Sequence, residues 1–283
     1  MEDLRFKDYF LFTQHSLATF NKCPLKFKKK YLDGLKWETF PDESVRYNIK
    51  KGLDFHLIAN RYFMDIDSGL FEDTEEYTDI NNLFENLKKN FKLKDKTLYL
   101  PEFKLRISND ILKLEANYDL ILVDKDSIYI YDWKTRSSNR ELNINKMRKG
   151  FTESLQTVVY MYVLSMQVSS IKKKYEEKFN EKLDDFSEYN IIMVYWMPEE
   201  PFELARINYS KTIHLDYEQK ILNNIKNILE YDYEDFDKDL FKSHCKYCEF
   251  NWFCNNEKVD FELIEETDEF LGELEWDDLD ELY

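Results

Sequence analysis

The sequence predicts an α/β fold in which helices cover a central β-sheet. Residues 114–123 and 128–134 are two runs rich in β-branched and aromatic side chains, separated by a polar break, which is typical of two strands joined as a hairpin. Residues 45–64 and 152–167 repeat apolar side chains at spacings of three and four, which indicates helices. Residues 189–197 are almost entirely apolar and indicate a buried strand.

The composition is that of a folded protein. The chain has 283 residues, which is enough for one large domain, alone or with an appended piece. Hydrophobic residues make up 43% and aromatic residues 17%, which argues against disorder. No apolar run approaches membrane-spanning length, and the amino end has no basic region before an apolar one. We therefore expect no membrane segment, no signal peptide and a cytoplasmic location.

The formal net charge of −17 argues against nucleic-acid binding unless the charge is unevenly distributed. Residues 257–283 carry 13 acidic residues and one lysine, so we divide the chain into a domain at residues 1–256 and an acidic tail. Nucleic-acid binding needs only a local basic face. Candidates for that face are Lys26, Lys28, Lys29, Lys30, Arg136, Arg140, Lys146, Arg148 and Lys149. An ordinary solvated surface explains these basic runs equally well.

The first predicted helical segment covers residues 16–27. Ser16 is suited to cap its start, and Phe20 and Phe27 are candidates for a buried stripe. Cys23 precedes a proline, which fits the start of a helix or a kink. Taken alone, this segment is an amphipathic helix with one buried thiol.

The second helical segment, residues 45–64, places His56 on its inward stripe. An inward histidine is more often a satisfied core residue than a ligand, so both interpretations stay open from the residues alone. Helical periodicity returns at residues 80–91, and residues 97–108 are extended with an interruption at Pro101.

The hairpin carries the residue types of a metal-dependent hydrolase. Asp119 lies in its first strand, and Asp132 and Lys134 lie at the end of its second. If the two aspartates meet, they form an oxygen-rich site suited to Mg²⁺ or Mn²⁺, with the carbonyl of Trp133 as a further ligand. Lys134 points to the same side as Asp132, because residues two apart on a strand share a face. A metal-bound water beside a lysine can hydrolyse a phosphodiester. The alternative is a solvated hairpin with one ion pair.

The segments after the hairpin complete the alternation of helices and strands. Residues 136–150 are polar and basic and are expected to form a loop. In the helix that follows, Gln156 and Tyr160 lie one turn apart on the same side. Two interpretations stay open: a half-buried polar edge of the helix, or a part of the functional site. Further helices are expected at residues 172–183 and 217–230.

The four cysteines have the most specific spacing in the sequence. Cys245, Cys248 and Cys254 form C-x₂-C-x₅-C, and Cys23 lies near the other end of the chain. In a cytoplasmic protein a close pair of cysteines favours metal over disulfides. Four thiolates suit either a [4Fe-4S] cluster or tetrahedral zinc, with His244 as a spare ligand in the zinc version.

This ordered set of motifs resembles the PD-(D/E)XK nuclease superfamily, and within it the RecB-like iron-sulfur group that includes the nuclease domain of AddB and the CRISPR adaptation nucleases. The motifs that carry the resemblance are Cys23-Pro24, Gly52-x₃-His56, Asp119 followed by Asp132-x-Lys134, Gln156-x₃-Tyr160 and the cysteine triplet. One departure is Ala116, at a position where the relatives usually have glycine. The resemblance implies a restriction-endonuclease-like core, which is a mixed sheet flanked by helices, and an iron-sulfur clasp that joins the termini.

The resemblance also implies roles for single residues. The expected metal ligands are His56, Asp119, Asp132 and the carbonyl of Trp133, and the expected cluster ligands are Cys23, Cys245, Cys248 and Cys254. Lys134 is expected to assist the attacking water, and Gln156 and Tyr160 to position the substrate.

We therefore expect a Mg²⁺- or Mn²⁺-dependent deoxyribonuclease that acts on single-stranded DNA or DNA ends. Two alternatives stay open: a non-catalytic nucleic-acid-binding or scaffold protein with the same cluster, and a zinc-clasped regulatory protein. The chain has no Gly-x₄-Gly-Lys-Ser/Thr loop and so no helicase motor of its own. The tail is rich in apolar residues as well as acids, and we expect it to bind a protein partner or the basic groove of the chain itself.

Overall fold

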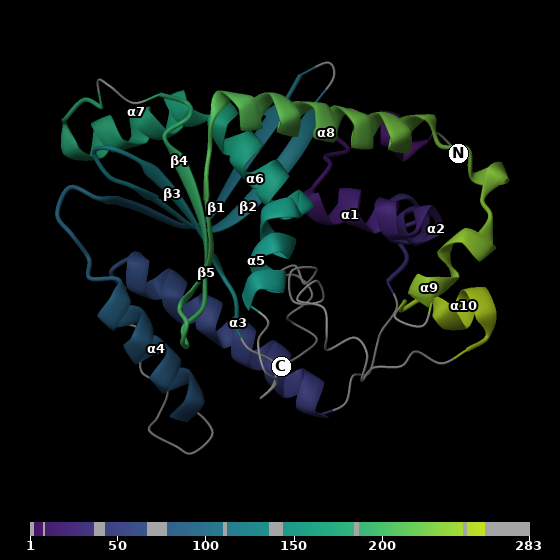
Figure 1. Cartoon of the computed structure of the whole chain (residues 1–283), viewed down its shortest axis with the longest axis horizontal. Helices are drawn as coiled ribbons and strands as arrows, with labels where there is room; N and C mark the ends of the chain where they lie inside the picture. Colours follow the sequence, from purple (N-terminus) through teal and green to yellow (C-terminus); the bar gives the residue numbers. More distant parts are fainter. Residues whose placement is uncertain are drawn as a thin grey trace. The chain divides into compact units, whose positions relative to one another are not determined.

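The computed structural model describes residues 3–7, 9–36, 43–66, 78–109, 112–135, 144–183, 187–245 and 248–257. The chain forms two compact units. Residues 50–220 make up the first, called here the sheet unit, and residues 1–49 with 221–283 make up the second, called the terminal unit. Figure 1 shows their elements in chain order. No helix in the described ranges is both long and apolar enough to span a membrane.

The sheet unit is built on a mixed five-stranded sheet with the strand order β1-β2-β3-β4-β5. The strands are β1 (Leu98–Ser108), β2 (Lys113–Val123), β3 (Ile128–Trp133), β4 (Ile191–Trp196) and β5 (Glu203–Asn208). β3 and β4 are parallel, and every other neighbouring pair is antiparallel. The parallel pair is possible because the long connection from β3 to β4 contains helices. The mixed sheet flanked by helices is confirmed, although no strand was expected at β5.

The predicted hairpin is confirmed as β2 and β3. Leu120 pairs with Tyr131, and the Asp124 side chain accepts hydrogen bonds from the backbone N–H groups of Asp126 (3.0 Å) and Ser127 (2.9 Å), which closes the turn. β1 is one continuous strand despite Pro101. Proline is tolerated there because β1 is an edge strand that pairs only with β2.

Two helices pack against one face of the sheet, α3 (Glu43–Phe63) and α4 (Thr78–Asn90), as Figure 1 shows. Trp133 lies in the core that they share with the sheet, stacked on Phe63 with ring centroids 6.0 Å apart and in edge contact with Phe55. This packing fixes α3 against the end of β3. His56 follows Phe55 directly and is therefore brought to that end of the sheet.

The predicted helix at residues 152–167 is two helices, α5 (Ile144–Glu153) and α6 (Leu155–Met166). They are separated at Ser154, whose side chain accepts a hydrogen bond from the backbone N–H of Thr157 and so caps α6. The basic segment expected as a loop is helical from Ile144 onward, and residues 136–143 lie outside the described residues. α6 is held on β2 by the Tyr118 hydroxyl, which donates to the carbonyl of Tyr160 (2.9 Å). The remaining helices of this region are α7 (Val168–Phe179) and α8 (Lys211–Glu230), the second of which continues into the terminal unit.

The terminal unit consists of short helices from both ends of the chain. They are η1 (Leu4–Phe6), α1 (Gln14–Lys22), α2 (Pro24–Phe27), η2 (Lys28–Leu32), η4 (Tyr233–Asp235), η5 (Lys238–Phe241), α9 (Lys242–Cys245) and α10 (Asn251–Asn255). The cap of α1 is Thr13, and Ser16, three residues later, is its reciprocal partner in a capping box. The prediction of Ser16 as the cap was therefore wrong. Pro24 starts α2, as its position after Cys23 predicted.

Candidate active site

Three carboxylates lie near one another on three adjacent strands. Leu120 pairs with Tyr131 across the hairpin, and Asp119 and Asp132 are the residues next to that pair in β2 and β3. Glu102 is the residue of β1 at the level of Asp119, because its neighbours in β1 pair with the neighbours of Asp119 in β2. The sheet thus gathers a high density of negative charge at one place.

Glu102 did not emerge from the sequence motifs. The β1–β2 pairing passes over it, and its backbone has a positive φ of 45°, which is uncommon for a residue other than glycine. Such irregularities in a strand re-aim a side chain and occur often near functional sites. The one signal in the sequence was a carboxylate inside an otherwise extended and largely apolar segment.

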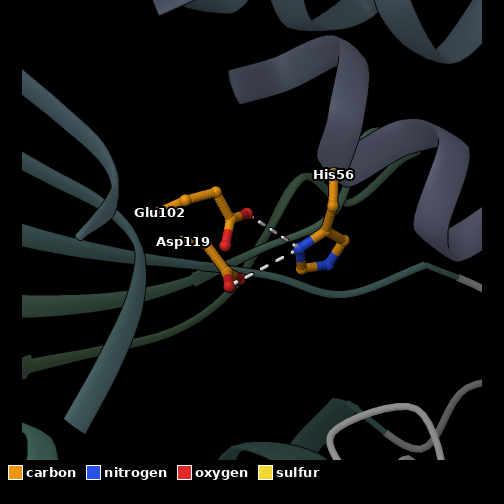
Figure 2. A group of neighbouring side chains, drawn as sticks. All are labelled: His56, Glu102 and Asp119. Atoms are coloured by element: carbon orange, nitrogen blue, oxygen red, sulfur yellow. Dashed lines mark ion pairs between the residues drawn. The ribbon is translucent and has the colours of Figure 1, made fainter. Parts of the chain in front are cut away.

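Figure 2 shows how His56 joins two of these carboxylates. Its Nδ1 lies 3.5 Å from Asp119 Oδ1 and 3.6 Å from Glu102 Oε1. The three side chains offer ligand atoms that all lie within 4.8 Å of one another, and no other such group of three occurs among the described residues. One imidazole nitrogen and two carboxylate oxygens suit Mg²⁺ or Mn²⁺.

The electrostatics of the group favour a bound positive charge. Burial lowers the pKa of His56, but the carboxylates of Asp119 and Glu102 outweigh it and raise this pKa to about 9. Burial raises the pKa of Asp119, and the charge of His56 opposes that rise. A proton on His56 therefore balances the carboxylates when no cation is bound.

Asp132 is held by two neighbours on the α6 side of the sheet. Lys134 Nζ lies 2.8 Å from Asp132 Oδ1, and Gln156 Nε2 donates to Asp132 Oδ2 (2.6 Å). Lys134 also donates to Gln156 Oε1 (3.4 Å), which closes a ring of three side chains. Burial raises the pKa of Asp132 to about 6, against the opposing charge of Lys134. Asp132 lies outside the close group formed by His56, Glu102 and Asp119.

Trp133 links the two parts of the site through its backbone. Its N–H donates to Asp119 Oδ2 (2.6 Å), while its side chain is buried in the aromatic core. Tyr160 is also buried, and its ring lies 4.9 Å from that of Tyr118. Burial raises the pKa of Tyr160, and the charges of Asp132 and Asp119 raise it further, so its hydroxyl stays protonated beside the carboxylates.

All four cysteines are free thiols in the terminal unit. Burial raises the pKa of Cys23, and the nearby Cys245 and Cys254 add to that rise. Burial also raises the pKa of Cys248, to about 12. No three of these sulfurs lie within 4.8 Å of one another. The terminal unit therefore brings the distant Cys23 into the neighbourhood of the carboxy-terminal cysteines without packing the sulfurs together.

The described basic residues that were candidates for a nucleic-acid-binding face lie in two separate segments, residues 26–30 and α5. Lys26 forms an ion pair with Glu249 (2.8 Å), and Lys29 Nζ lies 5.2 Å from the centre of the Phe253 ring, so this run contacts the cysteine segment. Lys28 pairs with Asp33. The exposed residues Arg148 and Lys149 lie on α5 with Lys146. Arg136, Arg140 and the acidic tail lie outside the described residues.

Comparisons with known proteins identify the family of the chain. A family model described as the PD-(D/E)XK nuclease superfamily matches residues 11–97 and 80–255. No curated protein matches the chain. Among solved structures, the crystal structure of SSO0001 is similar over 89% of this chain and 89% of its own, with 16% sequence identity and a TM-score of 0.36. Because the family model matches most of the sequence, the chain belongs to the PD-(D/E)XK nuclease superfamily.

Proposed function

We propose that this protein is a metal-dependent deoxyribonuclease that hydrolyses phosphodiester bonds in single-stranded DNA or at DNA ends. The observation that carries the proposal is the meeting of His56, Glu102 and Asp119 beside the Asp132–Lys134 ion pair. Incubation with end-labelled single- and double-stranded DNA, with Mn²⁺ or with EDTA, tests it. We expect cleavage that requires the metal. A purified protein that binds but never cuts either DNA would favour the non-catalytic scaffold.

The proposed ligands of the cation are His56, Asp119, Asp132 and the backbone carbonyl of Trp133, and the geometry adds Glu102 to this set. The donor set fits, because carboxylate oxygens with one imidazole suit Mg²⁺ and Mn²⁺. A cation at this place supplies a water of lowered pKa and offsets the charge that develops on the phosphate. His56 must lose its proton to act as a ligand.

The side chains on the α6 side prepare the attack on the phosphate. Lys134 presents an ammonium that orients the attacking water and offsets negative charge near it. Gln156 contacts both Asp132 and Lys134, so it fixes the distance between them. Tyr160 is proposed to position the substrate from the neighbouring turn of α6.

We also propose that the protein belongs to the RecB-like iron-sulfur group and that its four cysteines hold a [4Fe-4S] cluster. All four are free, and Cys23 lies near Cys245 and Cys254. Zinc sites commonly use two closely spaced pairs of ligands, whereas this chain has one distant cysteine and a C-x₂-C-x₅-C triplet, which favours the cluster.

The exposed basic face of α5 is proposed to bind the DNA backbone. Lys149→Ala is expected to weaken DNA binding several-fold and to lower the slope of log affinity against log salt by about 1, because one phosphate contact is lost. Fluorescence anisotropy of a labelled oligonucleotide across a salt series measures both quantities. The metal should be Ca²⁺, so that binding is observed without cleavage.

Lys173→Ala on α7 is the matched control for Lys149→Ala. The two lysines are equally exposed, at 75% and 76%, and each pairs with a glutamate one turn later, Glu153 and Glu177. The control is expected to keep the affinity and salt slope of the parent. Equal losses in both variants would mean that binding follows overall charge and not the α5 face.

The acidic tail is proposed to occupy the basic face or to bind a protein partner. Truncation after Asp260 removes most of its charge and is expected to tighten DNA binding if the tail competes with DNA. Anisotropy at low salt measures the affinity, and addition of the separate tail peptide should reverse the gain. An unchanged DNA affinity together with unchanged partner binding would reject both roles.

A further inference from the structure

The Lys134 ammonium lies against two aromatic rings as well as against Asp132. Its Nζ is 5.6 Å from the centre of the Tyr195 ring and 5.8 Å from that of Phe151. The two rings stack on each other, with centroids 4.2 Å apart and planes 16° apart. Both distances are within the range of about 6 Å in which a cation is attracted to an aromatic ring. Lys134 is therefore enclosed, and only 15% of its side chain is exposed.

The position of Tyr195 follows from the sheet. In the parallel pair of β3 and β4, Tyr195 is the direct partner of Asp132, which places its side chain beside the ion pair. Tyr195 is fully buried, and its hydroxyl is hydrogen-bonded to Thr157 Oγ1 (2.8 Å) and Ser154 Oγ (3.3 Å). Both of these residues lie at the start of α6.

Phe151 is held in place by the same hydroxyl groups. Its carbonyl accepts hydrogen bonds from Thr157 Oγ1 (2.6 Å) and Ser154 Oγ (2.9 Å). These hydrogen bonds connect the end of α5, the start of α6 and β4 next to Lys134. The Tyr195 hydroxyl also makes a long hydrogen bond to Gln156 Oε1 (3.5 Å), so the network contacts the site at Gln156 and not at a carboxylate.

We propose that Phe151 and Tyr195 form an aromatic seat that positions the Lys134 ammonium for the reaction, in addition to the hold of Asp132. The role in catalysis rests on the proposed nuclease function. Lysine has a long, flexible side chain that loses much conformational freedom when it is fixed. Asp132 is also a proposed cation ligand, so its carboxylate is shared between the cation and Lys134. The two rings hold the ammonium without using that carboxylate. Phe151 and Tyr195 are therefore positioning residues.

Kinetics of four variants test this role. Phe151→Leu and Tyr195→Leu are expected to lower kcat about 10-fold with KM within about 2-fold, because the ammonium is held less well while the DNA-binding surface is unchanged. Tyr195→Phe keeps the ring and is expected to stay within about 3-fold of the parent. Tyr209→Phe is the control, because it removes another largely buried hydroxyl, bonded to His214 and Ser165. The positioning role of the rings would be contradicted if the two leucine variants kept the kcat of the parent. It would also be contradicted if Tyr195→Phe lowered kcat as much as Tyr195→Leu does.

A second measurement does not depend on cleavage. Sulfosuccinimidyl acetate acetylates accessible lysines, and peptide mass spectrometry follows Lys134 relative to the exposed Lys173. We expect Lys134 to react several times faster in Phe151→Leu than in the parent, and at the parent's rate in Tyr195→Phe. Equal rates in Phe151→Leu and the parent would contradict the seat. If the parent cuts no DNA, the nuclease proposal fails, while the acetylation rates still decide whether the rings hold Lys134.

Discussion

Lys134→Ala is expected to lower the rate of DNA cleavage by about 10³-fold in a protein that still folds, with a loss of stability of up to about 3–5 kcal/mol because the buried Asp132 loses its ion-pair partner. The ammonium is the one cation of the chain paired directly with Asp132 among the described residues, and its loss removes the group that orients the water and offsets charge in the transition state. Single-turnover cleavage of labelled DNA with saturating Mn²⁺ measures the rate. Urea denaturation measures the stability.

Lys51→Ala is the matched control for this change. Its Nζ forms an ion pair with Glu199 (3.9 Å), and 14% of its side chain is exposed, against 15% for Lys134. The control is expected to cleave DNA at close to the parent's rate. Asp132→Ala is expected to share the defect of Lys134→Ala. Full activity in Lys134→Ala would remove this lysine from the mechanism.

Cys23→Ser is expected to prevent assembly of the proposed iron-sulfur cluster and to destabilise the protein by about 3–5 kcal/mol. Cys23 and Cys245 lie near opposite ends of the chain, so a cluster that joins them closes a very long loop, whose closure entropy is on the order of 5 kcal/mol. The parent, purified without oxygen, should be brown and contain stoichiometric iron and acid-labile sulfide. The variant should be colourless and unfold at lower urea concentration.

His244→Ala separates the cluster from the zinc alternative. His244 precedes Cys245 in α9 and is the spare ligand that a zinc site would use. With four cysteines on a cluster, His244→Ala is expected to keep the iron content and colour of the parent. A colourless parent that contains zinc, together with metal loss in His244→Ala, would contradict the proposed cluster.

The sequence predicted those parts of the site that depend on local spacing. Lys134 directly follows the end of β3, and its 2.8 Å ion pair with Asp132 agrees with the shared face that a spacing of two residues predicts in extended backbone. The polar break at Asp124 predicted the hairpin that brings the strand of Asp119 beside the strand of Asp132. His56 could be placed on an inward stripe because its helix has a clear period.

Other parts depend on contacts that spacing does not encode. Glu102 reaches His56 through an irregular strand pairing, which no local pattern reveals. The division of one predicted helix into two arises at Ser154, because its hydroxyl caps α6. The place of Tyr195 beside Asp132 depends on the register of a parallel strand pair whose members are far apart in the chain.

If His56, Glu102 and Asp119 bind a divalent cation beside Asp132, calorimetric titration with Mn²⁺ measures that binding. We expect the parent to bind Mn²⁺ and Glu102→Gln to bind it about 10- to 100-fold more weakly, since a carboxylate ligand is lost. Glu115→Gln is the control, because Glu115 lies on β2 but pairs with Lys104 and Arg106. Equal Mn²⁺ affinity in the parent, Glu102→Gln and Glu115→Gln would contradict a cation site at these three residues.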